Sequence, residues 1–138
     1  MREIKFRAWN KKEKFLDTAW SIDFEHGLVC HRAHNQSNLL DCELMQYIGL
    51  KDKNGREIYE GDIVDFTFFD FHDNSTNHKG VVKYRSGIYE IWKNNDSEFF
   101  ESDGPFILNF TWLQTEEFEV IGNIYENPEL LEEKTHDR

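Results

Sequence analysis

LMQYIGLKDKNGREIYEGDIV, residues 44–64, contains the clearest structural signal in this chain. The pair Asn54-Gly55 favours the tight turn that joins two antiparallel strands, and apolar runs lie on both sides of it. Gly61 comes just before a third apolar run, where glycine allows the sharp turn with which a new strand begins. A glycine followed by an acidic residue at the start of a strand also occurs in small SH3-like barrels. The stretch therefore predicts antiparallel β structure.

The N-terminal residues 4–9 alternate in the way expected of a half-buried strand. Ile4, Phe6 and Ala8 fall on one face. A short polar turn and an aromatic, extended stretch at residues 15–24 follow, which together predict a first hairpin. The side chains expected to face outward on its first strand are Lys5, Arg7 and Trp9.

Several further elements can be placed by their patterns. Residues 81–92 predict a second hairpin, and residues 72–78 predict an exposed loop. At residues 127–133, Asn127 suits the cap of a short helix and Pro128 its first position. The other predicted strands are residues 28–31, 106–112 and 118–125.

These elements predict a mainly β fold of roughly seven to nine strands. The length of 138 residues is close to the usual domain size, and no repeat, low-complexity block or Pro-rich linker divides the chain. We therefore expect one compact domain over residues 1–138, with a barrel-like or sandwich sheet, SH3-like elements and a short C-terminal helix. Residues 134–138 are expected to fray.

The formal charge of −11 is spread unevenly along the chain. Residues 1–69 hold ten basic and twelve acidic residues, whereas residues 70–138 hold six and fifteen. An acidic field repels phosphate backbones and favours basic partners, although acidity also serves solubility alone. With two cysteines, a charged N-terminus and no long apolar run, the sequence predicts a soluble cytoplasmic protein with no membrane association.

One group of residues carries metal-binding side chains, but its spacing is poor for zinc. Only His31 and His34 form a close pair, and Cys30 and His31 would point in opposite directions on a strand. Ordinary surface histidines in a loop explain the pattern better, so the sequence predicts no metal and no cofactor. The alternative zinc ligands would be His26, Cys30, His31, His34 and Cys42.

Catalytic motifs are also missing from the sequence. It has no Gly-rich phosphate loop, no Gly-x-Ser-x-Gly elbow and no His-Glu-x-x-His helix. Acidic residues near a strand entry and a loop could bind a divalent cation, but such residues are mostly solvated. We expect no catalytic residues and no enzymatic activity. The acidic set, with its histidine, is Asp62, Asp65, Asp70, His72 and Asp73.

Three segments, residues 2–9, 44–64 and 120–131, together resemble the YopX family of proteins from phages and prophages of Gram-positive bacteria. The resemblance spans the whole chain, although residues 17–42 and 66–118 contain no segment that can be matched to the family's motifs. The resemblance implies a β-rich fold, an origin in a mobile element, the cytoplasm of a bacterial host, and self-association. It implies no activity, because the family is uncharacterised.

The expected role is a non-enzymatic binding or assembly module whose partner is another protein or a second copy. The alternative is a nucleic-acid-associated module, in which aromatic side chains stack on bases beside cations. The negative net charge opposes this alternative, because it repels phosphate. Aromatic side chains on strands also usually pack in the core. The candidate binding residues are Lys5, Arg7, Trp9, Lys83, Tyr84, Arg85, Tyr89 and Trp92.

A related alternative makes the acidic second half an imitation of a nucleic-acid surface that occupies a basic site on a host protein. A solvated acidic face explains the same residues more simply. Its contact set would be Asp96, Glu98, Glu101, Asp103, Glu116, Glu117 and Glu119.

Overall fold

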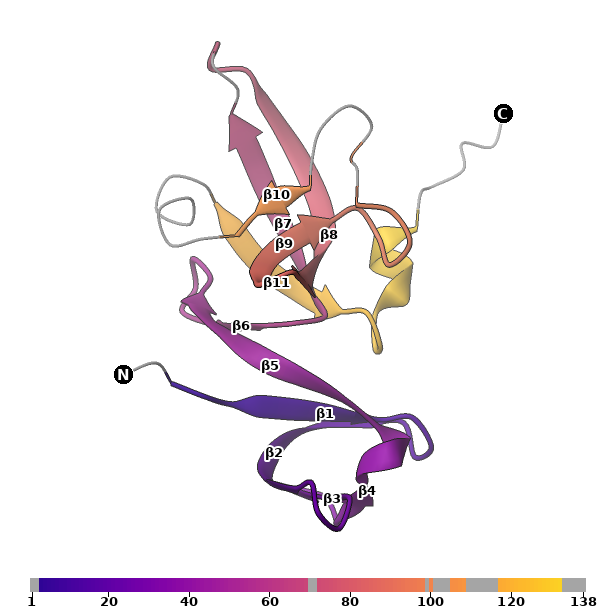
Figure 1. Ribbon diagram of the computed structural model, residues 1–138. Helices are drawn as coiled ribbons and strands as arrows, with labels where there is room; N and C mark the ends of the chain where they lie inside the picture. The colour runs from indigo at the N-terminus through magenta and orange to yellow at the C-terminus, as the bar shows by residue number, and fades with distance from the viewer. Residues whose placement is uncertain (1–2, 70–71, 99, 101–104, 109–116, 133–138) are drawn as a thin grey trace, which may run out of the picture. The chain divides into compact units, whose positions relative to one another are not determined.

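The protein is mainly β, with two antiparallel sheets (Figure 1). In this computed structural model, neither sheet closes into a barrel within the described strands. The chain divides into two compact units, an N-terminal unit, Met1–Gly49, and a C-terminal unit, Leu50–Arg138. The mainly β prediction is confirmed, and the assignment of one domain to residues 1–138 stays a prediction. The structure describes residues 3–69, 72–98, 100, 105–108 and 117–132.

The N-terminal unit begins with the predicted hairpin of β1 (Phe6–Asn10) and β2 (Phe15–Asp23). At its turn, the Asn10 Oδ1 atom accepts hydrogen bonds from the backbone N–H groups of Lys12 and Glu13, at 3.0 and 2.8 Å. Its strands belong to a six-stranded sheet in the order β4-β3-β2-β1-β5-β6, whose last strand, β6, consists of residues of the C-terminal unit. The elements that follow are β3 (Leu28–His31), β4 (Ser37–Asn38), the 3-10 helix η1 (Leu39–Asp41) and β5 (Cys42–Lys51).

A β-bulge interrupts β2 at Trp20. Ala19 lies opposite His31 and Ser21 lies opposite Cys30, so that one extra residue is inserted between them. Bulges bend a strand and redirect a side chain, and Figure 1 shows β2 curving between β1 and β3. The consequence is that the Trp20 side chain is 70% exposed.

One buried cluster of the N-terminal unit is built from small side chains. Ala8 and Val29 are fully buried and Cys42 nearly so, and Ala19, Leu39 and Leu44 pack against them. The predicted inward face is confirmed at Ala8 but wrong at Ile4, which precedes β1 and is 65% exposed. Arg7, expected to face outward, is buried, because β1 is an inner strand between β2 and β5.

The C-terminal unit holds a five-stranded sheet in the order β10-β9-β8-β7-β11 (Figure 1). The predicted hairpin at residues 81–92 is confirmed. The predicted loop at residues 72–78 is wrong in its second half, because Ser75–His78 pair with Phe66–Phe69 despite their polar side chains. The elements are β6 (Glu57–Tyr59), β7 (Asp62–Phe69), β8 (Ser75–Arg85), β9 (Ile88–Trp92), β10 (Phe106–Ile107), β11 (Phe118–Asn123) and the 3-10 helix η2 (Pro128–Leu131).

The numbered strands exceed the expected seven to nine because two-residue strands such as β4 and β10 give no periodic signal. The predicted strand over residues 106–112 is described only as far as Leu108, and its remaining residues lie outside the described part of the chain. So do residues 134–138, for which fraying was expected.

Phenylalanine rings fill the core of the C-terminal unit. Phe66 is 1% exposed, and its ring stacks on that of Phe118 with centroids 5.3 Å apart. Phe106 and Phe100 meet the same ring edge-on, at 5.3 and 6.0 Å. Gly80 leaves room for this packing, because a Cβ atom there would lie 2.5 Å from the Ile91 Cγ2 atom.

Asp52 organises the turn that the Asn-Gly pair predicted. Its Oδ1 atom accepts hydrogen bonds from the backbone N–H groups of Asn54 and Arg56, both at 2.9 Å. Its Oδ2 atom accepts one from the N–H of Val120, also at 2.9 Å. With Gly55 at a φ of 81°, the turn is thereby fastened to the edge strand β11.

In the last motif segment, residues 120–131, a side chain also hydrogen-bonds to the backbone. Asn127 does not cap η2 through its side chain as predicted, and the helix is a 3-10 turn. Its Oδ1 atom accepts instead a hydrogen bond from the backbone N–H of Asn123, at 3.2 Å. A Cβ atom at Gly122 would lie 2.6 Å from that oxygen, so glycine permits the contact.

Candidate functional site

The structure divides the predicted binding residues between the two units. One group lies on or beside β1 of the N-terminal unit, and the other on the β8–β9 hairpin of the C-terminal unit. The side chains of each group contact other residues of the same unit. The first comprises Lys5, Arg7 and Trp9, and the second Lys83, Tyr84, Arg85, Tyr89 and Trp92.

The cations of the hairpin are paired within the unit. The Arg85 Nε atom lies 3.0 Å from the Glu90 Oε1 atom, and the same guanidinium forms an ion pair with Glu98. Both cations also lie over the Trp92 ring, with the Lys83 Nζ atom 5.7 Å and the Arg85 Cζ atom 5.3 Å from its centroid. Burial lowers the pKa of Lys83. These contacts reduce the charge that the hairpin offers to a phosphate.

The aromatic residues of the hairpin do not form one stacking platform. Tyr84 lies opposite Tyr89, with ring centroids 5.3 Å apart in an edge-on contact. Lys83 lies opposite Glu90 in the neighbouring register position, which points to the other face of the sheet. The tyrosines are therefore separated by the sheet from the cations that were expected to act beside them.

The cations near the N-terminus are engaged as well. The Lys5 Nζ atom lies 2.7 Å from the Glu3 Oε1 atom and 5.6 Å from the centroid of the Tyr47 ring. The buried Arg7 places its Nη2 atom 3.6 Å from the Met45 Sδ atom. Packing explains these two side chains without a ligand.

The histidines and cysteines considered as zinc ligands do not converge. The His26 Nδ1 atom lies 2.8 Å from the Asp23 Oδ2 atom in an exposed turn. Cys30 is exposed, whereas Cys42 is buried, and burial raises the pKa of its thiol. Over the residues that the structure places, no three His, Cys, Asp or Glu side chains are arranged to hold a metal ion.

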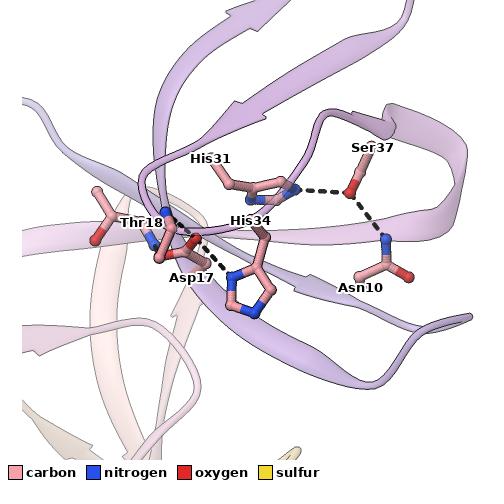
Figure 2. A network of polar contacts seen from close by, with 7 residues as sticks. Asn10, Asp17, Thr18, His31, His34 and Ser37 are labelled. Carbon is pink, nitrogen blue, oxygen red and sulfur yellow. Dashed lines mark hydrogen bonds and ion pairs between the residues drawn. The ribbon is translucent and has the colours of Figure 1, made fainter.

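His31 instead belongs to a buried polar network, which Figure 2 shows. Its Nε2 atom lies 2.7 Å from the Ser37 Oγ atom, to which the Asn10 Nδ2 atom donates a hydrogen bond of 2.9 Å. Burial lowers the pKa of His31, although the carboxylate of Asp17 opposes this effect. The network joins β1, β3 and β4 around a neutral imidazole.

Asp17 forms the second part of this network. The carboxylate accepts hydrogen bonds from the backbone N–H groups of Ala33, at 2.7 Å, and Thr18, at 2.8 Å. Its Oδ2 atom also lies 2.8 Å from the His34 Nδ1 atom (Figure 2). Burial opposes ionisation, but these bonds outweigh it and lower the pKa of Asp17. The ring of His34 stacks on Phe15, with centroids 3.9 Å apart.

A serine hydrogen-bonded to a histidine resembles part of a catalytic triad. Here, however, His31 and Ser37 are 6% and 9% exposed, and a substrate would have to displace the strands that they join. The arrangement therefore holds the small N-terminal unit together and supplies no reactive surface.

An apolar groove on the N-terminal unit is the candidate functional site. It has a volume of about 500 Å³ and is lined by residues 4–6, residues 18–22 and Phe24. The bulge turns Trp20 outward, and Phe24, just beyond the end of β2, is 73% exposed. Exposed apolar side chains gathered in this way are typical of interaction surfaces.

Charged residues accompany the apolar lining of the groove, which itself contains Lys5. Asp23 and Glu25 flank Phe24, and the Glu3–Lys5 pair flanks Ile4. The N–H and the ring of His26 both bond to the carboxylate of Asp23, which lowers its pKa and keeps it charged. Exposed carboxylates, those of Glu3, Asp23 and Glu25, thus lie next in the sequence to residues that line the groove.

Sequence reasoning did not find this groove. The extended stretch 15–24 was recognised, but a regular alternation hides which residue a bulge displaces. The one available signal was the pair Ala19-Trp20 followed by Ser21, where alternation breaks, and it does not say which side chain becomes exposed.

Comparisons with known proteins agree with the fold. Residues 5–132 match the model of the family described as YopX protein. The crystal structure of protein EF1440 from Enterococcus faecalis is similar, with 27% identity, a TM-score of 0.66, and coverage of 96% of this chain and 100% of that one. Protein yopX from Bacillus subtilis shares the fold at 20% identity, with a TM-score of 0.55 and coverage of 98% and 100%. No curated protein matches the chain.

Within the described part of the chain, no helix is long and apolar enough to cross a membrane.

Proposed function

This chain belongs to the YopX protein family, and we propose that it is a non-enzymatic binding module that contacts a protein partner through the apolar groove of its N-terminal unit. The observation that carries the proposal is the gathering of Ile4, Trp20 and Phe24 around one groove, exposed by 65%, 70% and 73%. A few residues carry most of the binding energy of a protein interface, and Trp is enriched among them.

The construction of the groove supports the proposal. Trp20 is exposed because β2 gains a residue, and the strand is paired with β1 up to Ala19, before the bulge, and with β3 from Ser21 to Asp23, after it. A tryptophan held outward by a paired strand loses little conformational freedom on binding. The groove is thus a preformed surface on a rigid sheet.

The family resemblance supports a phage or prophage origin, and we place the protein in the cytoplasm of the bacterial host. A protein partner fits the surface better than nucleic acid does. Arg85 pairs with Glu90 and Glu98, Lys83 is partly buried, and the chain carries a net charge of −11. Phosphate binding needs cations that are available to a ligand.

A second candidate function has one observation in its favour. The C-terminal unit holds twenty acidic and nine basic residues, whereas the N-terminal unit holds seven of each. All of the net charge therefore belongs to the C-terminal unit, which suits imitation of a nucleic-acid surface. Of its proposed contact residues, Glu101, Asp103 and Glu116 lie outside the described part of the chain.

The experiment is an affinity capture from host cells that carry the phage or prophage, with and without nuclease. Its baits are the wild-type protein, the double variant Trp20→Ser, Phe24→Ser, and the control Leu40→Ser. Leu40 is 91% exposed but does not line the groove. We expect a nuclease-resistant protein on the wild-type and control baits that is absent from the double variant.

Equal retention on all three baits would overturn the groove as the contact surface. Loss of the retained material on nuclease treatment would favour the nucleic-acid module. A partner that binds the double variant normally but is released by salt would favour the acidic C-terminal unit.

A further inference from the structure

We propose that the groove binds a basic protein segment, in which one or two large apolar side chains enter the groove and flanking Lys or Arg residues meet its acidic border. This inference rests on the proposed function and names the chemistry of the partner.

The apolar part of the inference follows from the exposed area. A Trp or Phe side chain contributes about 150–250 Å² when it is buried, and Trp20 and Phe24 are 70% and 73% exposed. Together they offer on the order of 250 Å² to a partner. A stable protein interface takes roughly 800 Å² from each side. The groove therefore fits a short segment with an apolar anchor and not a broad apolar surface.

Carboxylates next to the groove favour Lys or Arg residues in the partner segment. Asp23 and Glu25 lie on either side of Phe24, and the charge of Lys5 is balanced by Glu3 at 2.7 Å. The hydrogen bonds from His26 lower the pKa of Asp23. A cation that approaches the groove thus meets the exposed carboxylates of Asp23 and Glu25 beside Phe24.

The exposed indole of Trp20 adds a second reason for a basic partner. A Lys or Arg side chain gains from lying over an aromatic face, and Trp is the best of the aromatic residues for this contact. Long basic side chains can also cover apolar surface with their methylene stems. A segment with Arg or Lys beside its apolar anchor would make both contacts at once.

The carboxylates beside Phe24 argue against a second copy as the occupant. A symmetric dimer through the groove would bring Asp23 and Glu25 of one chain toward the same residues of the other. Self-association is therefore the less favourable use of this surface.

The test is selection of a random short-peptide library against the full-length immobilised protein. We expect the enriched peptides to combine a Trp, Phe or Leu with neighbouring Lys or Arg. Measured by fluorescence anisotropy, their affinity should fall roughly thirtyfold or more with Trp20→Ser. The double variant Asp23→Asn, Glu25→Gln should weaken them roughly threefold to tenfold at low salt, with a smaller effect at high salt.

The control is Glu13→Gln, which removes one carboxylate at the β1–β2 turn and leaves the groove intact. It should leave the affinity unchanged. Enriched peptides without basic residues that still depend on Trp20 would overturn the inference and spare the proposed function. No enrichment, or peptides that bind the Trp20→Ser variant equally well, would count against both.

Sedimentation of the wild-type protein tests whether a second copy of the chain occupies the groove. We expect a monomer at micromolar concentration. A dimer that Trp20→Ser dissociates would show that a second copy fills the groove, and would overturn the inference of a basic segment.

Discussion

Phe66 of the C-terminal unit and Trp20 of the N-terminal unit lie in opposite surroundings. Phe66 and Phe118 are 1% exposed and lie in a cluster of rings. Trp20 is 70% exposed beside a β-bulge. The difference separates side chains that build the fold from side chains that are available to a partner.

The family motifs follow the same division. The polar residues of the two long motif segments, such as Asp52 and Asn127, bond to backbone groups within the C-terminal unit. Trp20 and Phe24 lie within residues 17–42, between the motif segments, whereas Ile4 of the same groove lies within the segment 2–9. The two long motif segments therefore support the fold of the C-terminal unit, and the two most exposed aromatic residues of the groove lie outside them.

Replacement of Phe66 by Ala should have the largest effect on stability. The change removes a buried ring that contacts three others, and it should lower the free energy of unfolding by about 3–5 kcal/mol. Phe24→Ala should change it by less than about 0.5 kcal/mol. Urea unfolding measures the free energy for both variants. Similar losses for Phe66→Ala and Phe24→Ala would contradict the difference between buried and exposed aromatic residues.

Asp52→Ala should lower stability by about 3 kcal/mol, because it removes the acceptor of three backbone N–H groups, one of them buried. Asp52→Asn keeps one carbonyl oxygen and should lose less. Amide exchange should show that Val120 opens more readily in the alanine variant. An unchanged exchange rate would mean that Asp52 does not fasten the turn to β11.

Acid should weaken the N-terminal unit through His31. Burial lowers its pKa from the ordinary 6.5, so the unfolded chain binds a proton more readily than the folded one. This contribution to stability is present above pH 6.5 and is lost as the pH falls below that value toward the folded-state pKa.

The measurement is amide exchange of β1 and β3 between about pH 8 and pH 5, for the wild type and for His31→Gln. Protection in the wild type should decrease toward acid, and the glutamine variant should be less sensitive. Equal pH dependence in both proteins would show that His31 is not responsible.

Trp20→Ser should have the smallest effect on stability, within about 0.5 kcal/mol, because the side chain is already in water. The same change should abolish partner retention. Thermal unfolding and affinity capture on one preparation give both readouts, and a large loss of stability would mean that Trp20 packs within the unit.

The sequence predicted the elements that have regular local signals. Both hairpins and the Asn54-Gly55 turn are confirmed, because alternation and turn chemistry are properties of neighbouring residues. The burial of Arg7 depends on which strands lie beside β1, and strand order has no local signal. The same is true of the pairing of Ser75–His78 with Phe66–Phe69.

The candidate site was less predictable than the fold. The basic and aromatic residues chosen from the sequence occur in the right kinds of strand, but their charges are satisfied by Glu3, Glu90 and Glu98, which no spacing rule reveals. The groove depends on a one-residue bulge at Trp20. A bulge changes which face a side chain occupies without changing the composition of the strand.

Hydrogen–deuterium exchange of the protein with and without its captured partner tests the central claim most directly. The groove account predicts added protection in residues 15–25 of the N-terminal unit, with the β8–β9 hairpin unchanged. Added protection confined to residues 81–92, or to the acidic C-terminal unit as a whole, would contradict it.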